Sequence, residues 1–154
     1  MKRNKNSSDT VVSRGQNRCS MQFTRKGDYA LKAMTYLTQA GNAAPHTIDE
    51  ISHNSNIPRH FLAKILKDLT RAQLLVAVKG ARGGYNLARR ASDINLLEIM
   101  EVGAGPMSME ACMAGKERCP DTQTCALYPV WQKASNSIVG LLKSTRLSSL
   151  RQAR

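Results

Sequence analysis

The first structured part of the chain has apolar residues at helical spacing. From Thr24 to Gly41 they recur at the i, i+3, i+4, i+7 intervals that place side chains on one face of a helix. The inward positions are Ala30, Ala33, Met34 and Leu37. Thr24 can cap the start of this helix, and Gly41 can end it after Ala40. The pattern therefore predicts a helix from about Thr24 to Ala40.

Two further helices, separated by a turn, follow in the sequence. Thr47 and Glu50 form a capping-box signature that opens the first of them. Polar residues at 54–56 predict the turn, and Pro58 suits the start of the next helix, where its missing N–H costs nothing. The expected apolar face of that helix comprises Phe61, Leu62, Ile65, Leu66 and Leu69. Its outer face carries Arg59, His60, Ala63, Lys64 and Lys67. Two such helices with a basic outer face predict a helix-turn-helix.

A β-hairpin is predicted directly after the helix-turn-helix. Residues 75–78 favour one strand, residues 85–87 favour its partner, and residues 79–84 form a basic, glycine-rich tip. A hairpin in this position is the wing of a winged helix-turn-helix. We expect Arg82 to enter a minor groove, and Gly83 with Gly84 to let the backbone approach a phosphate. A tight turn requires such glycines as well, and the two interpretations are compatible.

Two helices are predicted in the remainder of the chain. Asn95 and Glu98 form a second cap signature, which opens a short helix through Val102; Gly103 and Gly105-Pro106 end it. A longer helix is predicted from after Cys125 to about Leu150. Its apolar residues alternate steps of four and three, as in the seam of a coiled coil: Leu127, Trp131, Ala134, Ile138 and Leu141. This seam favours a symmetric dimer, and packing against the chain's own helices is the alternative.

Positive charge is concentrated in two parts of the chain. The net charge of the 154 residues is +12. Residues 1–20 contribute +4 of this excess, and residues 57–90, which include the predicted recognition helix and wing, contribute +7. Such focusing on one element is typical of a protein with a polyanionic partner, and a solvated basic face is the alternative.

Composition and histidine placement exclude several classes of protein. No apolar run approaches the roughly 18 residues of a membrane helix, and the polar, basic N-terminus lacks the apolar segment of a secretory signal. We therefore expect a cytoplasmic protein. His46, His53 and His60 are scattered, and no nucleophile–base pair is apparent, so we expect neither an enzyme nor a small-molecule substrate.

Three of the four cysteines, Cys112, Cys119 and Cys125, lie in a C-x6-C-x5-C pattern. Gly115 and Pro120 between them disfavour regular structure, which predicts a loop carrying three thiols. In a reducing compartment such thiols are more often metal ligands or redox groups than disulfides. Zinc favours closer cysteine pairs and a histidine, whereas a metal-free thiol switch needs neither.

Four segments carry a resemblance to a known family. They are residues 23–30 (FTRKGDYA), 57–62 (IPRHFL), 80–85 (GARGGY), and the cysteine loop followed by 128–131 (YPVW). In this order they resemble the IscR/NsrR family of bacterial winged-helix regulators over about residues 21–150. The resemblance implies a homodimeric transcription factor that binds a double-stranded DNA operator. It also implies a [2Fe-2S] or [4Fe-4S] iron–sulfur cluster on the three cysteines.

The chain departs from the IscR-like pattern at two positions. IscR-like members carry a histidine ligand where this chain has Tyr128, a poor ligand because the ordinary pKa of tyrosine is about 10. In NsrR-like members the fourth ligand is an aspartate from the partner's first helix, and Asp28 occupies that position. Asp28 is therefore the candidate fourth ligand, and an exposed acid near the helix N-terminus is the alternative. Ala63 replaces a glutamate of the recognition helix and can contact only a thymine methyl, which implies a different operator.

The predicted fold is mostly α with a small β-hairpin wing: a winged helix-turn-helix plus a long C-terminal dimerisation helix. It divides into a disordered basic tail (1–20), a DNA-binding domain (21–103), a cysteine cluster-binding loop (104–125) and a dimerisation helix (126–150). The predicted DNA contacts are Thr24, Lys26, Arg59, His60, Ala63, Lys64, Lys67, Lys79, Arg82, Gly83 and Gly84. The expected function is transcriptional regulation controlled by the cluster, in response to redox state, nitric oxide or iron status.

Overall fold

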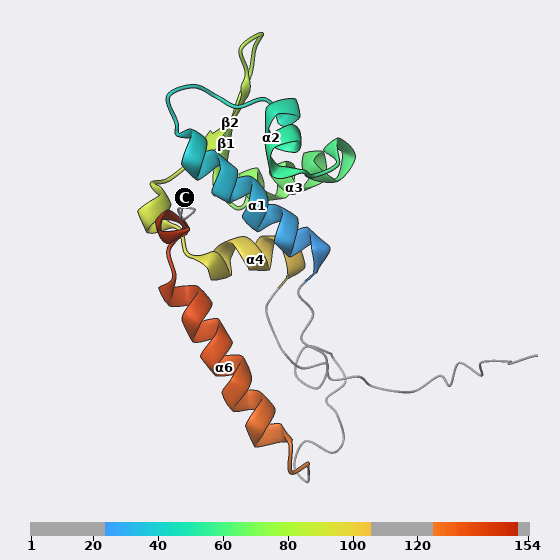
Figure 1. Cartoon of the computed structure of the whole chain (residues 1–154), viewed down its shortest axis with the longest axis vertical. Coiled ribbons are helices and arrows are strands. Elements are labelled where there is room, and N and C mark those ends of the chain that lie inside the picture. Colours follow the sequence, from blue (N-terminus) through green and yellow to red (C-terminus); the bar gives the residue numbers. More distant parts are fainter. Residues whose placement is uncertain (1–23, 106–124, 151–154) are drawn as a thin grey trace, which may run out of the picture.

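The computed structural model describes residues 24–105 and 125–150. The predicted tail over 1–20 and the predicted ligands Cys112 and Cys119 lie outside these ranges. Within them the chain is mostly helical, with one two-stranded antiparallel hairpin (Figure 1). The predicted fold class, a winged helix-turn-helix followed by a long helix, is confirmed. Neither described range contains a helix long and apolar enough to cross a bilayer.

The first three helices begin where their caps predict. In α1 (Arg25–Ala40) the Thr24 hydroxyl accepts a hydrogen bond from the N–H of Gly27, and Gly41 ends the helix with a φ of 82°. The capping box predicted for α2 (Ile48–Ser55) is complete at both of its hydrogen bonds. This helix extends into the predicted turn and ends at Asn56, in the left-handed conformation that asparagine tolerates. Pro58 then precedes α3 (Arg59–Arg71).

The core lies where α1, α2 and α3 meet, and it contains all but one of the predicted apolar positions of α1 and α3. The four predicted residues of α1 are fully buried, as are Leu62, Leu66 and Leu69 of α3, while Ile65 is 3% exposed. Phe61 contradicts the prediction because its side chain is 53% exposed. It lies at the edge of the apolar face of α3, beside Tyr29 of α1, rather than inside the core.

The wing consists of β1 (Leu75–Val78) and β2 (Gly84–Leu87), paired antiparallel with Leu75 opposite Leu87. Gly80 has a φ of 117°, which glycine adopts without strain. A Cβ on Gly84 would lie 2.4 Å from the carbonyl oxygen of His46, because the backbone of His46 bridges to Tyr85 alongside β2. The hairpin is thereby attached to the segment between α1 and α2.

A short 3-10 turn (η1, Ala91–Asp93) leads to α4 (Leu96–Ala104), whose Asn95–Glu98 capping box is present as predicted. The helix continues through Gly103 to Ala104, and Gly105, one of the predicted stop residues, is its C-cap; only the stop predicted at Gly103 is wrong. Gly103 instead faces the start of α1: a Cβ there would lie 2.5 Å from the Cα of Gly27. Two glycines therefore let α4 approach the backbone of α1 directly.

The last long helix, α6 (Tyr128–Ser144), extends away from the helical core (Figure 1). It ends six residues before the predicted end at Leu150, because the chain turns back at Thr145. Backbone hydrogen bonds then join Leu147 to Ile94 and Leu96 to Thr145. Leu147, in a second 3-10 turn (η2, Leu147–Ser149), is fully buried in the core. Residues 145–150 thus anchor the end of α6 to the helical core.

Candidate nucleic-acid interface and cysteine site

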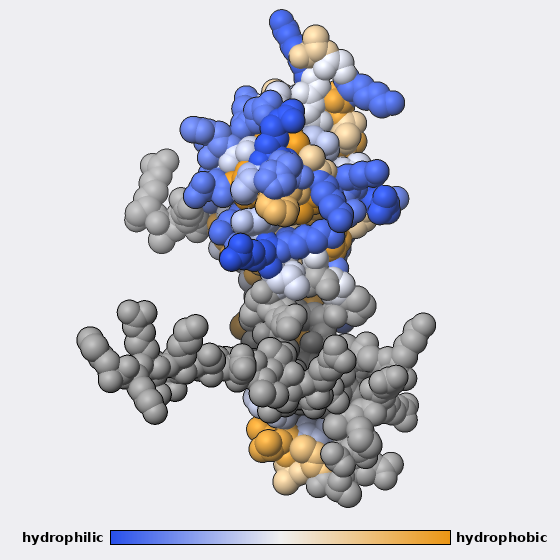
Figure 2. All heavy atoms as spheres, turned by 90° about the vertical axis from the view of Figure 1, so that its right-hand side faces the viewer, coloured by the Kyte–Doolittle hydropathy of each residue, from blue (hydrophilic) through white to orange (hydrophobic). Residues whose placement is uncertain are grey.

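The outward face of α3 carries the polar residues that the sequence predicted for it. All five are exposed: Arg59, His60, Ala63, Lys64 and Lys67. The inward face of the same helix holds four core residues, so packing fixes the direction in which these side chains point. Figure 2 shows this side of the molecule, where hydrophilic side chains gather over residues 24–105, here called the reader half, and the wing projects beyond them.

Ion pairing divides the basic residues of the reader half into two groups. On the flank between the wing and α4, Arg89 pairs with Glu98 (2.6 Å) and Arg90 with Asp93 (3.0 Å). By contrast, Lys64, Lys67, Lys79 and Arg82 have no acidic partner within 4 Å among the described residues. These four side chains lie on α3 and at the wing tip, so uncompensated positive charge remains on the predicted DNA-binding face.

Arg59 and Lys26, two more predicted contacts, are paired. The Arg59 guanidinium lies 2.6 Å from Asp49 of α2, but both side chains are largely exposed, so a competing phosphate could displace this pair. Lys26 donates to Asp68 of α3 across 2.7 Å. Its ammonium, together with the charges of Arg71 and Lys64, holds the pKa of the Asp68 carboxyl below its usual range. This pair joins the start of α1 to the recognition helix.

Thr24 and the wing glycines have the structural roles that the sequence also predicted for them, a helix cap and a tight turn. The Thr24 hydroxyl caps α1 by accepting from Gly27 across 3.1 Å. A Cβ on Gly83 would lie 2.4 Å from the carbonyl oxygen of Val78, inside the hairpin turn. The backbone of the protein itself therefore requires glycine at 83 and 84. Lys79 and Arg82 beside them are exposed.

The predicted metal ligands that the structure describes are Cys125 and Asp28. Cys125 is exposed with a free thiol, three residues before α6 begins. Asp28 lies on the surface of α1, 53% exposed, with Lys32 of the same helix 2.7 Å away. Within residues 24–105 and 125–150 no three His, Cys, Asp or Glu side chains come together to hold a metal ion. Three thiols and one accessible carboxylate are nevertheless a donor set that suits iron.

The predicted seam of α6 is only partly covered within residues 24–105 and 125–150: Ala134 and Ile138 are half-buried, and the other seam residues are exposed. No residue of α6 is buried, and the large apolar side chains near its two ends are 40–65% exposed. They are Leu127, Val130, Trp131 and Leu141. Hydrophobic atoms are visible at the far end of this helix in Figure 2. The helix contacts α4 only along part of its length, so the described part of the chain leaves these apolar side chains uncovered as a stripe.

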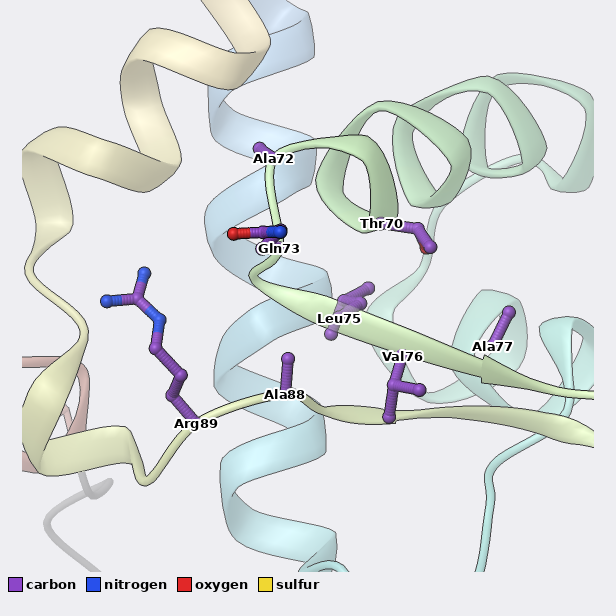
Figure 3. Close-up of a pocket in the computed structure, with 8 residues that line it drawn as sticks. All are labelled: Thr70, Ala72, Gln73, Leu75, Val76, Ala77, Ala88 and Arg89. Atoms are coloured by element: carbon purple, nitrogen blue, oxygen red, sulfur yellow. The ribbon is translucent and has the colours of Figure 1, made fainter.

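Two hollows on the reader half were not anticipated from the sequence. One, of about 790 Å³, lies between the C-terminal end of α3 and the base of the wing (Figure 3). Arg89 is the single charged residue of its lining, and its guanidinium already donates to Glu98. The other, of about 340 Å³, lies between α1 and α3 and includes Phe61. No local pattern predicts either hollow, because each depends on how separate elements pack.

The helix-turn-helix, the basic outer face of α3 and the hairpin that follows define a protein of the winged helix-turn-helix class. Residues 23–153 match the Rrf2 family, described as iron-dependent transcriptional regulators, and the chain belongs to that family. Members of this family regulate transcription by binding DNA, which agrees with the expectation drawn from the sequence.

Several relatives resemble the chain over most of their length. Protein aau3 of Rhizobium meliloti is 33% identical over 135 residues, which cover 87% of each chain. The regulator IscR of Photorhabdus laumondii is 29% identical over 130 residues, covering 84% of this chain and 79% of its own.

Two solved structures share the fold. IscR of T. potens superposes with a TM-score of 0.67 and 26% identity, covering 86% of this chain and 93% of that one. CymR, the global cysteine regulator of B. subtilis, gives a TM-score of 0.69 and 25% identity, covering 85% and 98%.

Proposed function

We propose that this protein is a homodimeric transcriptional regulator whose affinity for an operator is controlled by an iron–sulfur cluster. Cys112, Cys119 and Cys125 would hold the cluster, with Asp28 of the partner subunit as the fourth ligand. The reader would comprise residues 21–103, the cluster-binding loop residues 104–125, and the dimerisation helix residues 126–150. The signal would be redox state, nitric oxide or iron status.

The observation that carries the DNA-binding half of the proposal is the distribution of unpaired cations. Lys64 and Lys67 on α3, with Lys79 and Arg82 at the wing, have no acidic partner among the described residues. A recognition helix in the major groove would bring the wing over the neighbouring minor groove, where Arg82 would lie against its negative potential. The remaining predicted contacts, from Thr24 to Gly84, border the same face.

The sensing half of the proposal rests on the donor set. Three thiolates and a carboxylate would leave one iron weakly held, so that the cluster could be lost or oxidised as a signal. The Asp28 carboxylate is exposed, and its partner Lys32 is a flexible side chain of the same helix, so another subunit could reach it. Tyr128, the first residue of α6, remains a poorer candidate than Asp28, because a phenol is a weaker iron ligand than a carboxylate.

The dimer is proposed from the apolar stripe of α6. Leu127, Trp131 and Leu141 are exposed in a single chain, and burying apolar surface is the main driving force of association. A second copy packed in a symmetric arrangement would cover the stripe and set the distance between two recognition helices. Such spacing decides whether both helices reach successive major grooves.

The chain also contains a direct route from the cysteine loop to the recognition helix. The loop follows α4, and Gly103 at the end of α4 contacts Gly27 at the start of α1. The adjacent Lys26 is bonded to Asp68 of α3. The two glycine backbones are in contact, so no space between α4 and α1 can absorb a movement of the end of α4. Such a movement would therefore also shift α1 and the recognition helix.

Operator selection followed by titration at several salt concentrations tests the DNA-binding proposal. Arg82→Ala should lower the affinity and reduce the slope of log K against log salt by about 0.9, because one cation that displaces a counterion from the DNA is lost. It should also weaken the preference for a narrow minor groove. Lys143→Ala is the control, since this cation lies on α6, away from the reader face. Equal effects of the two substitutions would contradict the assignment of the wing.

A metal-free thiol switch is a second candidate, and one observation favours it. The Cys125 side chain is exposed and has no disulfide partner among the described residues, so it is open to oxidation by solutes. The structural neighbour CymR is a global cysteine regulator, whereas the neighbour from T. potens is an IscR. Zinc in the cysteine loop is the remaining alternative. Metal and acid-labile sulfide analysis of anaerobically prepared protein separates the three candidates: a cluster gives iron with sulfide, a zinc site gives zinc alone, and a thiol switch gives neither.

A further inference from the structure

The hollow between α1 and α3 has a chemically mixed lining. Its lining comprises the rings of Tyr29 and Phe61 with Ile65, here called the floor, and the cationic side chains of Arg25, Lys26 and Lys64, here called the rim. The two rings are tilted by 47° with their centroids 6.3 Å apart. The result is a cavity of about 340 Å³ with an apolar base and three cations around it.

Nothing in residues 24–105 and 125–150 covers the exposed side of Phe61. Its neighbours on α3 at the same apolar edge are buried, yet this ring is 53% exposed and rests against His60 and Tyr29. A large apolar side chain in the most basic part of a surface is unfavourably hydrated unless a partner covers it. The partner must also tolerate, or require, the surrounding positive charge.

The charges of the rim indicate an anion. Arg25 and Lys64 have no acidic partner within 4 Å among the described residues, and Lys26 is shared with Asp68. A ligand that pairs with the cations of the rim and also packs against the floor must carry a negative group next to an apolar surface. The sugar–phosphate unit of a nucleic-acid backbone has this character, because the deoxyribose ring presents C–H groups beside its phosphate.

The position of the hollow selects DNA over a free small molecule. Lys64 belongs both to the rim and to the outward face of α3, one turn after His60. A duplex seated on α3 would therefore pass over the hollow at the same time. Arg25, in the first turn of α1, would meet the strand that borders the groove occupied by α3.

We propose that this hollow is a socket for one sugar–phosphate unit of the operator, with Arg25 and Lys64 on the phosphate and Phe61 against the deoxyribose. The proposal rests on the proposed DNA-binding function and adds Arg25, Tyr29 and Phe61 to the contact surface. The socket would fix the register of the recognition helix, because backbone contacts position a reader without specifying a base.

A methylphosphonate scan of the selected operator tests the socket. Each duplex carries one neutral linkage, and its affinity is measured for the wild type, Arg25→Ala, Phe61→Ala and the control Lys143→Ala. We expect one linkage per half-site at which neutralisation lowers wild-type affinity several-fold. In Arg25→Ala, neutralising this linkage should lower the affinity much less than it does in the wild type. Neutralising any other linkage should lower the affinity of the two proteins equally. Phe61→Ala should lower affinity about threefold to tenfold on all duplexes.

The same scan distinguishes the ways in which the proposal could fail. If Arg25→Ala retains the wild-type pattern at every linkage, the socket is excluded while DNA binding stands. If the wild type binds no duplex, both the socket and the proposed function are excluded. Replacing a thymine by uracil removes its methyl group. If such a replacement lowers the affinity of the wild type but not that of Phe61→Ala, then Phe61 contacts the thymine base instead of the deoxyribose, which also excludes the socket. Thermal melting checks that the exposed substitutions leave the fold intact.

Discussion

At the scale of single residues, the ion pair between Lys26 and Asp68 is the interaction that links predicted DNA contacts to the fold. Asp68 is the one acid of the basic segment 57–90, and its side chain is only 20% exposed. Lys26 and Arg71 both lie within 4 Å of it. An acid at this place keeps Lys26 at the junction of α1 and α3 and leaves Lys64 and Lys67 free for a phosphate.

Asp68→Asn should destabilise the protein at neutral pH by no more than about 1 kcal/mol, since the pair is partly solvated. The pKa of Asp68 is lowered in the folded state, so its contribution is complete above the ordinary carboxyl pKa of about 3.9 and disappears as pH falls through the lower folded value. Urea unfolding at pH 7 and near pH 3 measures this. The difference in the free energy of unfolding between wild type and variant should be smaller near pH 3 than at pH 7. An equal difference at both pH values contradicts the role of the pair.

At the scale of elements, the contact of α4 with α1 shows what a one-dimensional pattern can and cannot predict. The capping signatures at Thr24, Thr47 and Asn95 predicted three helix starts, because caps depend on residues three apart. Gly103 looked like a helix stop for the same local reason. Its actual role, contact with Gly27, depends on a residue 76 positions earlier, and no local pattern reports it.

Gly103→Ala should destabilise the protein by about 1–3 kcal/mol, because the added Cβ would lie 2.5 Å from the Cα of Gly27 and one of the helices must move. Gly140→Ala in α6 is the matched control. A Cβ there meets nothing within 4 Å, so alanine should stabilise that helix by up to about 1 kcal/mol. Chemical denaturation measures both variants. Similar stabilisation by the two substitutions would show that α4 and α1 are not in this close contact.

At the scale of the whole molecule, the sequence predicted the reader and the basic face better than the ends of the elements. Amphipathic periods and turn residues are local and strong, so the order of helices and hairpin was correct. Phe61 was misplaced because spacing alone cannot separate the middle of an apolar face from its edge. The end of α6 was misplaced because Leu147 returns to a core built by distant segments.

The exposed stripe of α6 should make the assembly sensitive to polar substitution. Replacing both Leu127 and Leu141 by Gln should shift the protein from dimer to monomer and weaken operator binding, since one subunit would contact one half-site. Ser137→Gln on the same helix is the control, because Ser137 is exposed and outside the stripe. Sedimentation velocity gives the mass. A double variant that stays dimeric would place the interface elsewhere.

The central claim, that a cluster on the cysteine loop controls DNA binding, is tested most directly by operator affinity measured alongside iron and sulfide content. Anaerobically prepared protein should contain both iron and acid-labile sulfide, and removing the cluster should change its affinity for the selected operator. Asp28→Ala should alter the visible spectrum or lifetime of the cluster while the cluster-free form binds the operator like the wild type. A colourless protein that contains zinc, or no metal, and whose affinity follows thiol oxidation alone would contradict the account.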